Sequence, residues 1–279
     1  MNIKQNPFSF YDFLGYFTPG AFFLYAFISI IPHISFFAEL STFINTNHNI
    51  DKVELYIPFV LISYIIGHIL SFLSSVTVEI YSIWTVGYPS KYLLGIEIKP
   101  YMSIQEPKLI NQIGRYVLPI ILLPFVCLDF LIGRLLGLKS IYAKPLDKLL
   151  IDLIIRKVTA LLNENKIYAE KKVKPKIRDD NYFRFVYHYC VEHAPNHFPK
   201  MQNYVALYGF LRTLTLLAVI CFWILTSFIC TGQLEICRGI FYLLLTSVCS
   251  YTLFMAFTKF YRRFSLEAFM ALTAIYPKK

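Results

Sequence analysis

Charged residues are scarce in this sequence. Asp, Glu, Lys and Arg make up 16% of the 279 residues, against about 25% in a typical soluble domain. Hydrophobic residues reach 57%, and several apolar runs are longer than the core helices of ordinary soluble folds. The scarcity of charge therefore excludes an ordinary soluble domain, and the long apolar runs predict an all-α integral membrane protein.

Familiar enzyme motifs are also absent. The sequence has no Walker phosphate loop and no G-x-G-x-x-G, H-E-x-x-H or G-x-S-x-G motif. It shows no internal repeat and no cleavable signal peptide, because the first apolar run is long and lacks a small-residue exit. We therefore expect a protein that is not an enzyme and binds no cofactor. An intramembrane hydrolase that uses Ser71 or Ser75 with His68 is the least favoured alternative.

Four apolar runs are long enough to cross a bilayer, which needs about 20 residues. They are Phe13–Phe36, Val53–Val76, Val205–Ile229 and Ile240–Phe257.

Lys and Arg are concentrated in the loops that would lie on one side of the membrane. The loop between the first two runs has neither before Lys52, and the loop between the last two has only Arg238, whereas Lys139–Lys200 is rich in both. Since basic residues stay on the cytoplasmic side, both termini and the middle of the chain are predicted to be cytoplasmic. The net charge of +10 favours anionic lipid headgroups over nucleic acid as the partner. The abundance of Phe, Tyr, Ile and Lys, with little Gly, favours a bacterial inner membrane.

A fifth apolar run, Tyr116–Leu138, has basic residues at both flanks. It contains Pro119, Pro124 and Asp129, which argue against a plain lipid-facing helix. We predict a re-entrant or interfacial helical hairpin that bends near Pro124. The alternative is a fifth crossing that reverses the orientation of the later spans.

The segment YDFLGYFTPG places Asp12 and Tyr16 one helical turn apart, just before Pro19 and Gly20. Pro suits the first turn of a helix, so this segment is interpreted as a helix start at the membrane interface. The alternative is that Asp12 faces a cavity.

Small residues recur every four positions in the second run, at Ser63, Gly67, Ser71 and Ser75. This stripe allows a second helix to approach closely, within one chain or between subunits of a homo-oligomer. A polar pore lining is the alternative.

Ionisable residues at membrane depth need partners or a cavity. His68 is expected either to be a hydrogen-bonded structural residue or to serve ion passage. The charges expected at depth are Glu79, Asp129, Arg134 and Arg212. For Arg212, pairing with Asp129 or with Glu79 is the hypothesis, and an interfacial position is the alternative.

The segment Ile141–Lys200 is the only sizeable polar part. Its first half has the apolar spacing of an amphipathic helix, and it is predicted to cap the membrane region or to pair with another subunit. Cys190, His193 and His197 share a helix face, but Pro195 interrupts it, so a metal site is not favoured.

Cys230 and Cys237 flank the predicted outer turn TGQLEI. They form a disulfide if the outside is oxidising, and otherwise remain two reduced thiols.

The opening NPFSFYDFLGYFTPG, at Asn6–Gly20, resembles the start of various uncharacterised bacterial multi-pass membrane proteins with a D-F-x-x-Y-x-x-P-G pattern. YGFLRT at Tyr208–Thr213 and FYRRF at Phe260–Phe264 add to this resemblance. Some of these proteins are thought to act as membrane partners or effectors in phage-defence loci. The resemblance implies that role as an expectation and assigns no function to any residue.

The sequence thus predicts four transmembrane helices, a re-entrant hairpin and a small cytoplasmic helical cap. The expected regions are a membrane region at 1–138, a basic cytoplasmic segment at 139–203, and a membrane hairpin with a tail helix at 204–279. The favoured function is an oligomer that forms or gates a membrane pathway, because broken membrane segments often line pathways. The alternatives are a membrane anchor that recruits a cytosolic partner through residues 141–200 and, last, a membrane-embedded enzyme.

Overall fold

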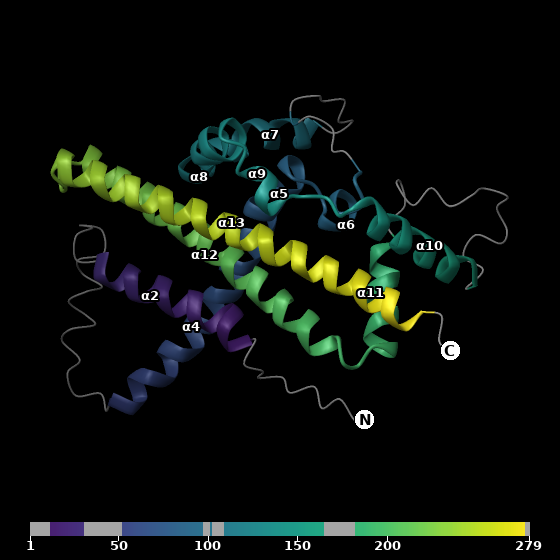
Figure 1. Cartoon of the computed structure of the whole chain (residues 1–279). Helices are drawn as coiled ribbons and strands as arrows, with labels where there is room; N and C mark the ends of the chain where they lie inside the picture. Colours follow the sequence, from purple (N-terminus) through teal and green to yellow (C-terminus); the bar gives the residue numbers. More distant parts are fainter. Residues whose placement is uncertain (1–11, 31–51, 97–100, 102–108, 165–181, 277–279) are drawn as a thin grey trace.

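Helices are the only regular elements in the part of the chain that the computed structural model describes (Figure 1). This part comprises residues 12–30, 52–96, 101, 109–164 and 182–276. In chain order the first half contains the π-helix η1 (Phe13–Phe17), α2 (Thr18–Ile30), α4 (Lys52–Ser74), the π-helix η4 (Ser75–Glu79), α5 (Ile80–Thr85), α6 (Pro89–Tyr92), α7 (Leu109–Ile121) and α8 (Leu123–Leu128). The second half contains the π-helix η5 (Asp129–Leu135), α9 (Lys139–Tyr142), α10 (Lys148–Glu164), α11 (Phe183–His193), α12 (Phe198–Cys230) and α13 (Ile236–Ile275).

In the residues that the structure describes, three continuous helical stretches are long and apolar enough to cross a membrane. They are Ile57–Tyr92, Phe198–Cys230 and Ile236–Ile275, and a bent helix pair adds a fourth candidate if it counts as one span. The predicted all-α membrane fold is confirmed. Of the first predicted span, the structure describes a shorter apolar helix at Phe13–Phe27, and residues 31–36 lie outside the described residues.

The hairpin of α12 and α13 forms the long axis of the molecule (Figure 1). Gly232, in the turn between the two helices, has a φ of 72°, which is a left-handed conformation that glycine adopts without strain. The helices have 33 and 40 residues, which at 1.5 Å per residue gives about 50 and 60 Å. Both therefore exceed a hydrocarbon core of about 30 Å and project beyond it.

The bent pair lies where the sequence predicts a broken segment. Residues Gln112–Ile121 and Leu123–Gly133 meet at an angle of 89°. The break falls at Leu122, and Pro124 stands in the first turn of α8, where its missing N–H costs no hydrogen bond. The predicted bend near Pro124 is therefore present, two residues earlier than the proline itself.

Two clusters of buried side chains hold the helices together. One cluster joins α5, the bent pair, α12 and α13, and Phe125 and Phe254 stack at its centre with ring centroids 4.7 Å apart. The other joins α10 and α11 to the last turns of α13, through Val158, Val186 and Leu272. The segment predicted as a cap thus shares one core with the end of α13.

Apolar side chains also cover the outer faces of α4 and of the first half of α13. Ile65, Phe72 and Phe241 are among those that remain exposed. Many exposed apolar side chains on such helices are typical of contact with lipid or with another subunit.

Candidate functional site

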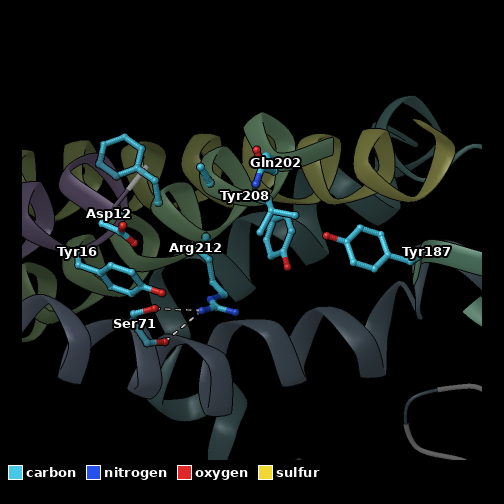
Figure 2. Close-up of a pocket in the computed structure, with 12 residues that line it drawn as sticks. Asp12, Tyr16, Ser71, Tyr187, Gln202, Tyr208 and Arg212 are labelled. Atoms are coloured by element: carbon cyan, nitrogen blue, oxygen red, sulfur yellow. Dashed lines mark hydrogen bonds between the residues drawn. The ribbon is translucent and has the colours of Figure 1, made fainter. Parts of the chain in front are cut away.

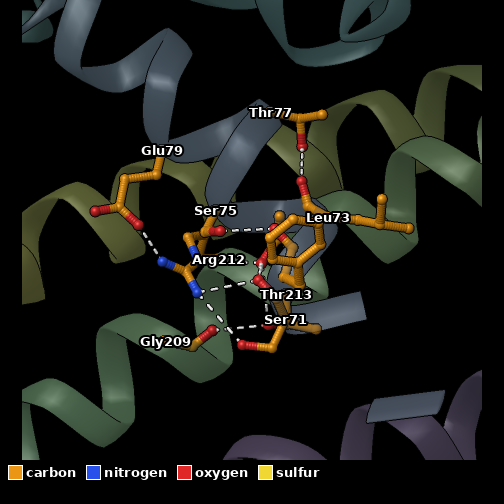
Figure 3. A network of polar contacts seen from close by, with 10 residues as sticks. Ser71, Leu73, Ser75, Thr77, Glu79, Gly209, Arg212 and Thr213 are labelled. Atoms are coloured by element: carbon orange, nitrogen blue, oxygen red, sulfur yellow. Dashed lines mark hydrogen bonds and ion pairs between the residues drawn. The ribbon is translucent and has the colours of Figure 1, made fainter. Parts of the chain in front are cut away.

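A buried arginine on α12 is the centre of the main polar network (Figure 3). The Arg212 side chain forms an ion pair with the Glu79 carboxylate, and the Nε atom donates a hydrogen bond to Ser74 Oγ at 3.0 Å. A second guanidinium nitrogen donates to the Ser71 carbonyl oxygen at 3.2 Å. The network thus connects α12 to the end of α4 and to η4.

The local backbone explains how Glu79 reaches this arginine. Glu79 is the last residue of the π-helix η4, which begins directly after α4 ends at Ser74. A π-helical turn inserts an extra residue and rotates the side chains that come after it, and such turns are frequent at functional sites. Of the two partners that the sequence left open for Arg212, the structure selects Glu79.

Ser74 is a member of this site that the sequence analysis missed. It lies outside the four-residue stripe, yet it is fully buried, and its hydroxyl lies 3.4 Å from the Thr213 hydroxyl. Thr213 itself donates to the Gly209 carbonyl oxygen at 2.9 Å. A helical projection that includes Arg212 would have found Ser74, because it lies three residues beyond Ser71 on the same helix face.

A polar cavity of about 400 Å³ lies beside Arg212 (Figure 2). Its walls come from η1, α4, α11 and α12, and they include Asp12, Tyr16, Ser71, Gln202 and Arg212. Asp12 therefore lines a cavity, which is the alternative that the sequence analysis left open. Gly209 also lines the cavity, and a Cβ atom at that position would meet nothing within 4 Å.

The stripe of small residues divides between two neighbours. A Cβ atom at Gly67 would lie 1.9 Å from the Tyr16 carbonyl oxygen, and one at Gly20 would lie 1.8 Å from the Ser63 carbonyl oxygen. Ser63 and Gly67 therefore lie at a backbone contact with η1 and α2, whereas Ser71 contacts Arg212. Ser75 donates only to the Phe72 carbonyl oxygen of its own helix.

Within the described residues, His68 contacts two aromatic rings. Its ring stacks on Tyr16 with a centroid distance of 4.0 Å and meets Tyr64 edge-on at 4.6 Å. The reason is its place next to Gly67, where the close backbone approach brings Tyr16 over the imidazole. Within the described residues His68 shows no hydrogen bond to Ser71 or Ser75, the serines considered for a hydrolase.

Asp129 belongs to a separate cluster of tyrosines. Tyr142 donates to one carboxylate oxygen at 2.8 Å, and Tyr81 donates to the other at 3.3 Å. The carboxylate is almost fully buried, and a Cβ atom at Gly133 would lie 2.7 Å from Asp129 Oδ1. Burial, and then the neighbouring carboxylate, raise the pKa of Tyr142 well above its usual range, so this hydroxyl remains a donor. The side chain of Arg134 lies outside the described residues.

The three residues considered for metal binding have separate partners. The Cys190 thiol donates to the Ala268 carbonyl oxygen at 3.3 Å, and His193 Nδ1 lies 3.0 Å from the Tyr189 carbonyl oxygen. His197 Nδ1 lies 2.8 Å from a carboxylate oxygen of Glu267. In the part of the chain that the structure describes, no group of His, Cys, Asp and Glu side chains is arranged to hold a metal.

Cys230 and Cys237 are both exposed free thiols at the turn between α12 and α13. Their disulfide stays a prediction that depends on the redox state outside the membrane.

Comparison of the chain with protein-family models, with curated proteins and with solved structures finds no match.

Proposed function

We propose that this protein is a non-enzymatic oligomer in the bacterial inner membrane that forms or gates a pathway for small ions, with both termini in the cytoplasm. The observation that carries the proposal is the cavity of about 400 Å³ beside the buried Arg212–Glu79 ion pair. Ionisable residues within apolar helices are costly, and they commonly mark ion pathways.

The contents of the cavity suit this role. Asp12, Ser71 and Gln202, from three different segments, supply acceptors and donors to the lining, so an ion or water molecule could exchange its hydration for protein contacts there. The charge of Arg212 is balanced by its ion pair with Glu79, and the cavity lining carries both a basic and an acidic residue, Arg212 and Asp12.

The bent pair supports the same proposal. We assign α7 and α8 to a re-entrant hairpin that returns to the cytoplasmic side, because both flanks of this segment are basic. The Arg115 guanidinium lies over the Trp84 ring at 4.9 Å, a contact that suits an aromatic belt at the membrane interface. Broken helices at membrane depth are tolerated where they are buried in protein or line a wet cavity.

Oligomer formation follows from the exposed faces of α4 and α13. The cavity is enclosed by one chain on several sides, whereas the apolar face that bears Ile65 and Phe72 has no cover within the described residues. In a homo-oligomer, part of this face would contact a second copy.

The decisive experiment is ion flux in liposomes with Gly209→Leu. The Cβ atom of the new side chain meets no atom within 4 Å, and leucine is a better helix former than glycine, so the variant should fold like wild type. Flux should fall strongly. Ser227→Leu is the matched control, because it adds the same side chain to α12 at an exposed position. Wild-type flux in Gly209→Leu, or no flux in wild type, would contradict the proposal.

A second candidate function is an anchor that recruits a cytosolic protein, as in a phage-defence system. The observation in its favour is an exposed apolar edge beside and along α10, where Ile141 and Leu149 are 74% and 76% exposed. The double substitution Ile141→Glu with Leu149→Glu should abolish recruitment of the cytosolic protein but leave ion flux unchanged. Because α10 shares a core with α13, these exposed positions are a cleaner test than deletion of the helix.

A further inference from the structure

A second cavity, of about 560 Å³, lies between the cap and the membrane helices. We call it the tyrosine cavity, because four tyrosines line it from α11, α12, α13 and the residue before α6. Two basic residues and two serines, one in α6 and the other in α13, also line the cavity. The lining residues used below are Tyr88, Ser90, Lys91, Arg184, Tyr187, Tyr208, Tyr261 and Ser265.

Several polar side chains of this cavity have no hydrogen-bond or ion-pair partner within the part of the chain that the structure describes. The hydroxyl groups of Tyr187, Tyr208 and Tyr261 form no hydrogen bond with another described residue, and Tyr208 and Tyr261 contact each other only through stacked rings 4.9 Å apart. Lys91 and Arg184 likewise form no ion pair within the described ranges. Arg184 is exposed, whereas Lys91, Tyr187, Tyr208 and Tyr261 are partly buried. Partly buried donors without partners are costly, so this arrangement favours a ligand that accepts hydrogen bonds.

The charge of the lining favours an anion. Lys91 and Arg184 line the cavity, and among the described residues no Asp or Glu belongs to its lining. Hydroxyl donors combined with ammonium and guanidinium groups are the usual partners of a phosphate, which accepts charge-assisted hydrogen bonds from several directions. The tyrosine rings add flat apolar walls for the remainder of such a ligand.

The position of the cavity along the membrane axis agrees with this chemistry. Lys91 lies in the last turn of the helical stretch Ile57–Tyr92, and Arg262 and Arg263 follow the apolar part of α13. Basic residues at the ends of membrane helices lie at the level of lipid phosphates.

The geometry points to the tyrosine cavity as a binding site for a phosphate-bearing ligand, with Lys91 and Arg184 on the phosphate and the tyrosine hydroxyls as further donors. The shared chemistry fits an anionic phospholipid headgroup and a soluble phosphate monoester. Tyr187 and Tyr208 line this cavity and also the cavity beside Arg212, so an occupant would contact the shared wall. Phosphate binding itself does not depend on the proposed ion pathway.

The test measures binding to the purified full chain in neutral detergent. Native mass spectrometry compares phosphatidylglycerol with phosphatidylcholine, and calorimetry measures adenosine monophosphate and inorganic phosphate. The double variant Lys91→Gln with Arg184→Gln should lower the affinity for the preferred ligand by about tenfold or more. Lys144→Gln with Arg156→Gln is the matched control, because it removes the same charge from exposed positions outside the cavity and should leave binding unchanged.

The two sources of phosphate give different results. Loss of phosphatidylglycerol selectivity assigns the site to lipid, and loss of binding of the soluble phosphates assigns it to a cytoplasmic ligand. Tyr187→Phe with Tyr261→Phe keeps both rings and should also weaken binding, which provides a second test if the charge variant does not fold. The inference is overturned if wild type binds phosphatidylglycerol no more tightly than phosphatidylcholine and also binds neither soluble phosphate. It is equally overturned if every cavity variant binds like wild type.

Discussion

Arg212 on α12 and Glu79 at the end of η4 form a largely buried ion pair between residues 133 positions apart in the chain. The pair joins the second membrane helix to the α12–α13 hairpin at the wall of a polar cavity. Its removal should therefore affect both the stability of the helix bundle and the cavity.

We expect Arg212→Met and Glu79→Gln each to lower the free energy of unfolding by about 3 kcal/mol, because each leaves the other group buried without its partner. The double variant should lose much less than the sum of the two. Denaturant unfolding in mild detergent measures all three. Strictly additive losses would show that the pair contributes no coupling energy.

The glycines of the membrane helices should respond to alanine in opposite ways. Gly67→Ala places a methyl group 1.9 Å from the Tyr16 carbonyl oxygen, so η1 and α2 must separate from α4 and stability should fall by at least about 2 kcal/mol. Gly209→Ala meets open space and should be neutral, or stabilising by up to about 1 kcal/mol. Thermal unfolding of the two variants checks the ranking. Equal effects would mean that the close helix approach at Gly67 is absent.

The two tyrosines that donate hydrogen bonds to Asp129 should differ in how much each stabilises the fold. Tyr142→Phe removes a hydrogen bond of 2.8 Å to a buried carboxylate and should cost about 2 kcal/mol, whereas Tyr81→Phe removes one of 3.3 Å and should cost less. Unfolding midpoints of the two variants test this order. A larger loss for Tyr81→Phe would reverse the assignment of the stronger donor.

The cysteines should differ widely in reactivity. Burial raises the pKa of the Cys190 thiol to about 12, while Cys230 and Cys237 are exposed. Since the thiolate is the reactive form, a maleimide at pH 7.5 should label the exposed pair first and Cys190 only after denaturation. Labelling of Cys190 in the native protein at the rate of Cys230 would contradict its burial against α13.

The same shift gives a pH dependence. The thiol of an unfolded cysteine has a pKa of about 8.5, whereas burial raises the pKa of the native Cys190 thiol to about 12. Its contribution to stability is therefore complete below pH 8.5 and is lost as the pH rises toward 12. Cys190→Ala should make the decline of stability above pH 8.5 shallower, as measured by denaturant unfolding across this range.

Local patterns account for the features that sequence reasoning predicted well. The helical period of apolar residues located α10 and the membrane helices, and the prolines of the fifth run located its break within two residues. Both signals act within a few turns of one helix, so they need no knowledge of its neighbours. The stripe at Ser63 and Gly67 marks a close contact for the same reason, since small side chains permit it wherever a partner exists.

The choice of partners was beyond the sequence. Arg212 could have paired with Asp129 or Glu79, and the π-helix η4, which has no simple sequence signal, places Glu79 within reach. His68 turned toward Tyr16 because of a backbone contact at the neighbouring glycine. The four tyrosines of the tyrosine cavity lie as far apart as positions 88 and 261.

The sequence by itself determined that this chain forms apolar helices broken at defined points, because composition and period fix the free energy of each segment in a membrane. Only the tertiary structure decided which charges, serines and tyrosines meet, because those contacts join segments far apart in the chain and depend on small rotations of one helix against another.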